Sequence, residues 1–154
     1  MSRAPRKPQP GARLTWLRRF GVNTVGLLVW ASGVGWLVFH YFLQQKGEFG
    51  PEPHPLEPWW LKLHGATGFA ALWTVGLLWA VHIVNGWTSG RRRWTGSVMF
   101  VLLCVLILTG YLLYYVGDVP ARPVISLTHW IGGLVLPASY LLHRLLERRP
   151  PGQA

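Results

Sequence analysis

Four long stretches without a charged side chain constrain this chain more than any other feature of its sequence. They run from Phe20 to Gln45, from Leu63 to Gly90, from Trp94 to Gly117 and from Pro123 to His143. A helix needs about 20 apolar residues to cross the roughly 30 Å hydrocarbon core of a bilayer, so each stretch is long enough for one crossing. The sequence therefore predicts an all-α fold, a four-transmembrane-helix bundle, with spans at about 20–43, 60–85, 96–116 and 124–146.

The composition argues in the same direction. Hydrophobic residues make up 51% of the 154 residues and charged residues 13%, whereas soluble domains carry about 25% charged residues. The helices of a soluble bundle would also show a polar stripe, and the segment Val98–Val116 has none. A disordered chain is excluded and an ordinary soluble enzyme is disfavoured. The single cysteine, Cys104, excludes an internal disulfide, a zinc ribbon and covalent haem attachment through CxxCH.

Lysine and arginine are divided very unevenly between the two ends of these spans. Twelve would lie on one side of the membrane, namely Arg3, Arg6, Lys7, Arg13, Arg18, Arg19, Arg91, Arg92, Arg93, Arg144, Arg148 and Arg149. Three would lie on the other side, namely Lys46, Lys62 and Arg122. By the positive-inside rule, this division predicts a multi-pass protein with both termini in the cytoplasm. The net charge of +10 then marks topology and a surface for anionic membrane lipid, and we expect no binding to nucleic acid.

The segments outside the spans are short. Residues 1–19 form a basic cytoplasmic tail that we expect to be disordered because it is polar and rich in proline. Residues 147–154 form a short cytoplasmic C-terminal tail, so the transmembrane domain occupies residues 20–146. The outer segment Gln44–Pro58 is rich in proline and has no helical period, and we expect it to cover the outer face.

Four histidines lie inside the second and fourth predicted spans, where ionisable side chains are costly and therefore indicate function. His64 and His82 are 18 residues apart, which is about five full helical turns and a rise of about 27 Å. His129 and His143 are 14 residues apart, which is about four turns and 21 Å. Each span therefore carries one histidine near each membrane surface, and both histidines of a span share one face.

The second and fourth spans run in the same direction, so their histidines can form two pairs. His64 and His129 would face each other near the outer surface, and His82 and His143 near the inner surface. Two opposed neutral imidazoles are axial ligands of haem iron, so the sequence predicts two haem b sites with these four residues as metal ligands. Because spacings of 18 and 14 residues differ by about 6 Å of rise, the inner pair needs helix tilt, a kink at Pro137 or a different ligand.

Small residues near the outer pair favour a cofactor between the helices. Gly68 follows His64 by one turn, and Gly133 follows His129 by one turn, so a flat macrocycle could approach the backbone at both glycines. We therefore predict that both bind the cofactor, although small residues also serve ordinary helix packing in membranes. His40, near the outer end of the first span, is a competing outer ligand, and an interhelical hydrogen bond is the alternative role for any single histidine.

These residues resemble the cytochrome b-like four-helix membrane proteins of bacteria, which include b-type subunits of respiratory complexes. The resemblance covers about residues 20–146. It depends on LHGATGF with His64, AVHIVNGW with His82, and LTHWIGGLVLPASYLLHRL with His129 and His143. It implies that the four histidines ligate two b haems in the bacterial inner (cytoplasmic) membrane.

The resemblance implies transmembrane electron transfer, with a quinone oxidised or reduced at one haem edge. Since the chain has no soluble catalytic module, it would be the membrane cytochrome subunit of an oxidoreductase complex. Its partner would be a periplasmic c-type cytochrome, an iron–sulfur protein or a molybdenum enzyme. Two other functions stay open: a non-redox membrane anchor or assembly subunit, and a small transporter that uses the histidines as metal ligands.

Overall fold

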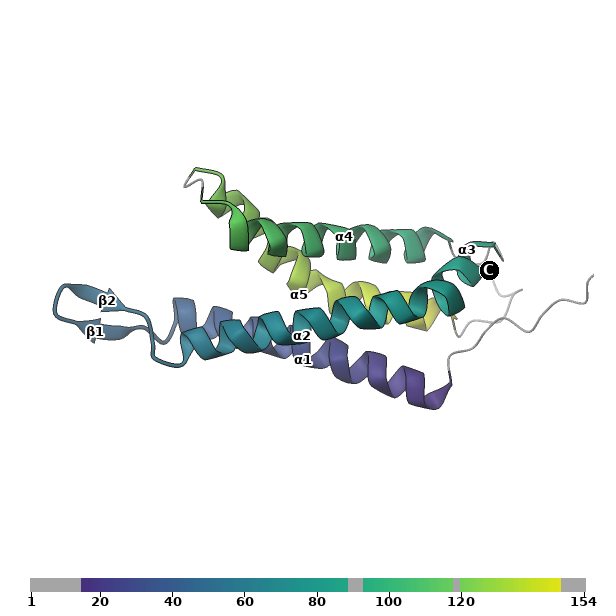
Figure 1. Cartoon of the computed structure of the whole chain (residues 1–154), viewed down its shortest axis with the longest axis horizontal. Coiled ribbons are helices and arrows are strands. Elements are labelled where there is room, and N and C mark those ends of the chain that lie inside the picture. The colour runs from purple at the N-terminus through teal and green to yellow at the C-terminus, as the bar shows by residue number, and fades with distance from the viewer. Residues whose placement is uncertain (1–14, 89–92, 118–119, 148–154) are drawn as a thin grey trace, which may run out of the picture.

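The computed structural model describes residues 15–88, 93–117 and 120–147, and most of this part of the chain is helical (Figure 1). Long helices follow one another, and the connection between the first two contains a hairpin. The elements in chain order are α1 (Trp16–Tyr41), β1 (Gln45–Gly47), β2 (Gly50–Glu52), α2 (Glu57–Leu78), the π-helical turn η1 (Trp79–Ile83), α3 (Val84–Thr88), α4 (Arg93–Tyr115) and α5 (Arg122–Glu147).

Three helices are long and apolar enough to cross a membrane, namely α1, α4 and the part of α5 from Arg122 to Leu146. By length and composition, they confirm the prediction of transmembrane helices for the first, third and fourth predicted spans. The second predicted span is helical as well, through α2, η1 and α3, but α2 does not meet the same criteria. The first two turns of α2 carry Glu57, Lys62 and His64, and the regular α-helix already ends at Leu78.

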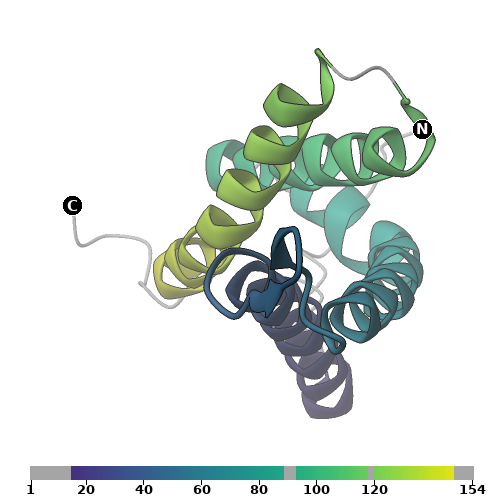
Figure 2. The same ribbon diagram turned by 90° about the vertical axis from the view of Figure 1, so that its left-hand side faces the viewer.

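The helices pack as two pairs of consecutive helices. α1 lies along α2, and α4 lies along α5 (Figure 1). Fewer contacts join the two pairs, chiefly between α1 and α5 and between α3 and α4. One of them is a hydrogen bond in which the Tyr140 hydroxyl of α5 donates to Oδ1 of Asn23 on α1 at 2.6 Å. The view along the helices shows the two pairs facing each other (Figure 2).

The buried positions of the described residues are polar or small. They are Ser32, Thr109 and Gly132, and no apolar side chain in the described ranges is buried. Large apolar side chains instead point outward along every long helix, as expected for helices whose surroundings are hydrocarbon. In the described part of the chain, the buried side chains with polar groups are therefore those of Ser32 and Thr109.

The segment between α1 and α2 forms a short hairpin rather than the expected extended cover. β1 and β2 pair antiparallel, with Gly47 opposite Gly50. Gly50 has a φ of 130°, a conformation that only glycine adopts readily. The hairpin projects beyond the helix ends along the long axis of the molecule (Figure 1). α2 then begins at Glu57, with Pro58 in its first turn, a position that proline favours.

The chain ends differ in part from the predicted tails. α1 begins at Trp16, so Arg18 and Arg19 belong to the first helix rather than to the N-terminal tail. Residues 1–14 of that tail, residues 89–92 and residues 148–154 lie outside the described part of the chain.

Candidate functional site

The outer predicted pair of histidines comes together in the structure. The ring centroids of His64 on α2 and His129 on α5 are 6.1 Å apart, and the ring planes are inclined at 83°. α2 and α5 belong to different helix pairs, so the two rings approach each other from opposite sides of the interior.

The hydrogen bonds of His64 determine which ring nitrogen carries the proton. Nδ1 lies 3.0 Å from the carbonyl oxygen of Val29 on α1, and a carbonyl only accepts, so Nδ1–H donates. Ser32 lies beside them, with its Oγ 3.2 Å from the same nitrogen and 3.0 Å from the Val29 carbonyl. A neutral imidazole protonated on Nδ1 has a lone pair on Nε2. Nε2 is therefore the nitrogen of His64 that can bind a metal ion.

His129 is held in the same way by α4. The Thr109 hydroxyl lies 2.9 Å from Nδ1 of His129 and 2.7 Å from the carbonyl oxygen of Val105. Since the hydroxyl has one proton and donates it to the carbonyl, it accepts the hydrogen bond from Nδ1–H of His129. Both outer histidines thus carry their lone pair on Nε2.

The inner predicted pair has nearly the same geometry. The ring centroids of His82 and His143 are 6.2 Å apart, with the planes at 88°. Nδ1 of His143 lies 3.0 Å from the Thr95 hydroxyl near the start of α4, and its Nε2 is a buried atom. The structure therefore gathers the four histidines into two pairs, and their binding to a cofactor stays a prediction.

A π-helical turn, which the sequence analysis does not predict, positions His82. It spans Trp79–Ile83 and includes the histidine itself. A π turn takes one extra residue into a helical turn, so His82 lies about 100° of rotation and about 1.5 Å of rise from its ideal α-helical position. This removes part of the difference in rise between the 18-residue and 14-residue spacings. π turns are also frequent at functional sites.

Three of the histidines contact the same two-residue motif on a neighbouring helix, a hydroxyl residue followed by glycine. We call these the hydroxyl–glycine dipeptides: Ser32–Gly33 beside His64, Thr109–Gly110 beside His129 and Thr95–Gly96 beside His143. A Cβ atom on the three glycines would lie 2.9, 3.2 and 3.8 Å, respectively, from Cε1 of the histidine. The hydroxyl orients the ring, and the glycine lets the ring lie against the helix backbone.

A repeated spacing in the sequence could have revealed two of these dipeptides. Thr95 and Thr109 on α4 are 14 residues apart, as are His129 and His143 on α5. Because consecutive helices run antiparallel, equal spacings keep both hydroxyls in register with both histidines. The spacing of the histidines alone does not reveal this match.

The two glycines predicted to bind the cofactor lie beside open space. A Cβ atom on Gly68 or Gly133 would meet no atom of another helix within 4 Å, although both residues are only partly exposed. Gly132 differs, since its Cβ would contact Leu102 and Leu106 of α4 at 3.4 and 3.3 Å. Gly132 thus belongs to the contact between α4 and α5, whereas Gly68 and Gly133 leave room for a group from outside the chain.

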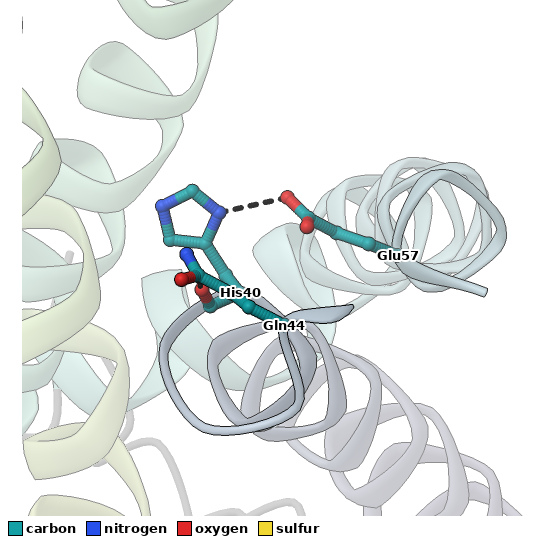
Figure 3. Close-up of polar contacts among 3 residues, drawn as sticks. All are labelled: His40, Gln44 and Glu57. Carbon is teal, nitrogen blue, oxygen red and sulfur yellow. Dashed lines mark hydrogen bonds and ion pairs between the residues drawn. The ribbon is translucent and has the colours of Figure 1, made fainter. Parts of the chain in front are cut away.

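His40 does not join the outer pair. Its Nδ1 lies 2.7 Å from Oε1 of Glu57 (Figure 3), and its ring stacks on Trp36 with a centroid distance of 4.5 Å. The Gln44 side-chain amide donates to the backbone carbonyl of His40 at 3.0 Å. The contacts of His40 therefore favour a partnership with a carboxylate over the competing role of outer ligand.

The separation of the rings in both pairs fits one metal ion between two imidazoles. A metal–imidazole bond is about 2.0 Å long and the nitrogen lies about 1.2 Å from the ring centroid, so opposed ligands have centroids about 6.4 Å apart. Within the described ranges, no group of three or more His, Cys, Asp and Glu could hold a metal ion. Within these ranges, each pair thus offers two protein ligands.

No protein-family model, characterised protein or solved structure matches this chain.

Proposed function

We propose that this chain is a di-haem b-type cytochrome subunit of a membrane oxidoreductase, built as a four-helix transmembrane bundle. The observation that carries the proposal is the pairing of His64 with His129 at a centroid distance of 6.1 Å, with the lone pair of both rings on Nε2. The pairing of His82 with His143 at 6.2 Å repeats this geometry near the other end of the helices.

A haem fits this donor set better than a bare metal ion does. The described part of each site supplies two imidazoles and no third protein ligand, whereas a porphyrin brings four nitrogen ligands of its own. His64 and His129 would hold the outer haem, and His82 and His143 the inner haem. The open space beside Gly68 and Gly133 would admit the macrocycle. When bound, a haem supplies reversible one-electron redox chemistry at its iron.

The arrangement of the helices supports four crossings and a path across the membrane. α2 lies along α1, which meets the criteria for a membrane span, so the second helical segment would share its membrane depth. The two sites are about 21 Å apart along α5, which covers most of the roughly 30 Å hydrocarbon core. In the proposed orientation both termini face the cytoplasm of a bacterial cell. Electrons would pass between a quinone and a periplasmic or membrane redox partner.

A spectrum of the purified protein tests the proposal. We expect a reduced-minus-oxidised spectrum of low-spin b haem and two haems per chain. His129→Ala should leave about one haem, whereas His54→Ala should leave two, because His54 lies in the connecting segment and contacts Phe39. A wild-type protein that purifies folded but without haem would favour the alternative, a non-redox membrane anchor in which the histidines serve helix packing.

A further inference from the structure

A histidine–carboxylate pair joins the outer ends of α1 and α2 (Figure 3). Nδ1 of His40 lies 2.7 Å from Oε1 of Glu57, and the side chains are 39% and 13% exposed, respectively. The ring of His40 stacks on Trp36 and meets the ring of Tyr41 edge-on at 4.7 Å. Glu57, Trp36 and Tyr41 thus contact the imidazole, which stays partly exposed near the end of α1.

The pair lies about two helical turns above the outer histidine site on both helices. Glu57 precedes His64 by seven residues on α2, and His40 follows Gly33, which contacts His64, by seven residues on α1. Seven residues of an α-helix turn by about 20° less than two full turns and rise by about 10 Å. His40 and Glu57 therefore stand on the same helix faces as the contacts of the outer site.

We propose that His40 and Glu57 form a proton-binding site whose affinity follows the charge of the outer histidine site. The inference rests on the proposed function, because it requires a redox centre between His64 and His129. Addition of one electron from an external reductant lowers the charge of that centre by one. One proton then passes from the outer aqueous phase to the His40–Glu57 pair and forms one N–H or O–H bond, so charge is balanced.

Coulomb's law gives the size of the coupling. Unit charges about 10 Å apart at an effective dielectric constant of about 20 change a proton affinity by roughly tenfold. Other charged or titratable groups lie at the same end of the molecule. In the described part of the chain they include Glu57 and Tyr41 in contact with His40, Lys62 over the Trp59 ring, His54 against Phe39, Arg122 bonded to the Val116 carbonyl, and Lys46, Glu48 and Glu52 of the hairpin that follows α1.

The experiment measures the midpoint potential of each haem in the purified full-length protein between pH 5 and 9, followed by absorbance. His129→Ala identifies the outer haem by its loss. A tenfold higher proton affinity of the reduced state corresponds to a total fall of about 59 mV for the outer haem as pH rises through the window. A pH indicator should record proton uptake on reduction.

His40→Gln should make the outer potential independent of pH and abolish the matching proton uptake. Glu57→Gln tests the same site from the carboxylate side, should His40→Gln fail to fold. The matched control His54→Gln, which changes another histidine near the outer end, should behave as wild type. The inference is overturned, and the proposed function is not, if the outer potential keeps its pH dependence in both His40→Gln and Glu57→Gln. The same holds if the outer potential of the wild type does not vary with pH. A folded protein without haem overturns the proposed function and this inference with it.

Discussion

The Thr109 hydroxyl lies between a backbone carbonyl and Nδ1 of His129, 2.7 Å from the first and 2.9 Å from the second. Because it donates to the carbonyl of Val105, it accepts from the imidazole, so a residue on α4 determines the tautomer of a histidine on α5. The Val29 carbonyl does the same for His64 from α1. The helix that does not carry the histidine thus decides which ring nitrogen keeps a lone pair.

Thr109→Val should weaken the outer haem site while leaving the inner one intact. Valine has nearly the same shape, but Nδ1–H of His129 loses its acceptor and the ring loses its fixed orientation. Loss of such an outer-shell partner typically lowers metal affinity by about 10- to 100-fold. Haem retention during dialysis against an excess of a haem-binding protein measures the effect.

Thr74→Val is the matched control for this substitution. The Thr74 hydroxyl bonds only within α2 among its described contacts, to the carbonyl of Ala70 at 2.7 Å, so we expect wild-type retention. Thr109→Ser keeps the hydroxyl and should restore most of the affinity. If Thr109→Val retained haem as wild type does, the hydroxyl would not orient the ligand.

Gly33→Ala should disturb the outer site directly at the ring of His64. The new Cβ would lie 2.9 Å from Cε1 of His64, closer than real Cβ contacts allow, so the ring or the helix must move. We expect a changed electron paramagnetic resonance spectrum of the outer haem. Gly21→Ala adds the same methyl group to α1 where nothing lies within 4 Å, and its spectrum should match wild type. Identical spectra for both variants would contradict the close packing of His64 on α1.

Hydrophobic length and histidine periodicity were enough to predict the helices and the partner of each histidine. Runs without charge predicted the long helices, of which α1, α4 and α5 meet the criteria for a membrane span. The pairs at 6.1 and 6.2 Å agree with the expectation of equal depth on two helices of one direction. These features depend on regular helix geometry, so the spacing of residues in the sequence was enough to predict them. Haem binding itself stays a prediction.

The features that the sequence did not predict depend on local departures from that geometry or on contacts across a loop. A pattern of residues that assumes 100° of rotation per residue does not reveal the π turn around His82. Glu57 meets His40 only because a hairpin of otherwise unremarkable residues returns the chain to the same end of α1. The hydroxyl–glycine dipeptides are short, and two of them become visible only when their spacing is compared with that of the histidines.

Gly68→Leu separates the haem proposal from a simple membrane anchor. A Cβ at Gly68 meets no neighbouring helix within 4 Å, so without a cofactor a larger side chain would fit and helix packing would persist. With a macrocycle against this glycine, leucine should displace the haem and lower outer haem occupancy at least tenfold. Gly65→Leu, three residues earlier at an exposed and equally open position, should keep both haems. Full occupancy in Gly68→Leu would remove this glycine from the proposed site.

The location of the C-terminus distinguishes four crossings from three. α2 does not meet the criteria that α1, α4 and α5 meet, so length and composition alone would permit a three-span protein with its termini on opposite sides. The packing of α2 along α1 and the pairing of His64 and His82 with residues of α5 support our proposal that α2 is a fourth crossing at the depth of its neighbours. A fourth crossing returns the C-terminus to the side of the arginine-rich N-terminus, which is the cytoplasm by the positive-inside rule.

A reporter fused after Ala154 should therefore be active only in the cytoplasm, and one inserted after Glu48 only in the periplasm. Periplasmic activity of both fusions would place α2 outside the membrane, and the two histidine pairs could not then lie at two depths within the bilayer. Periplasmic activity of the C-terminal fusion with cytoplasmic activity of the Glu48 fusion would instead reverse the orientation and exchange the two faces.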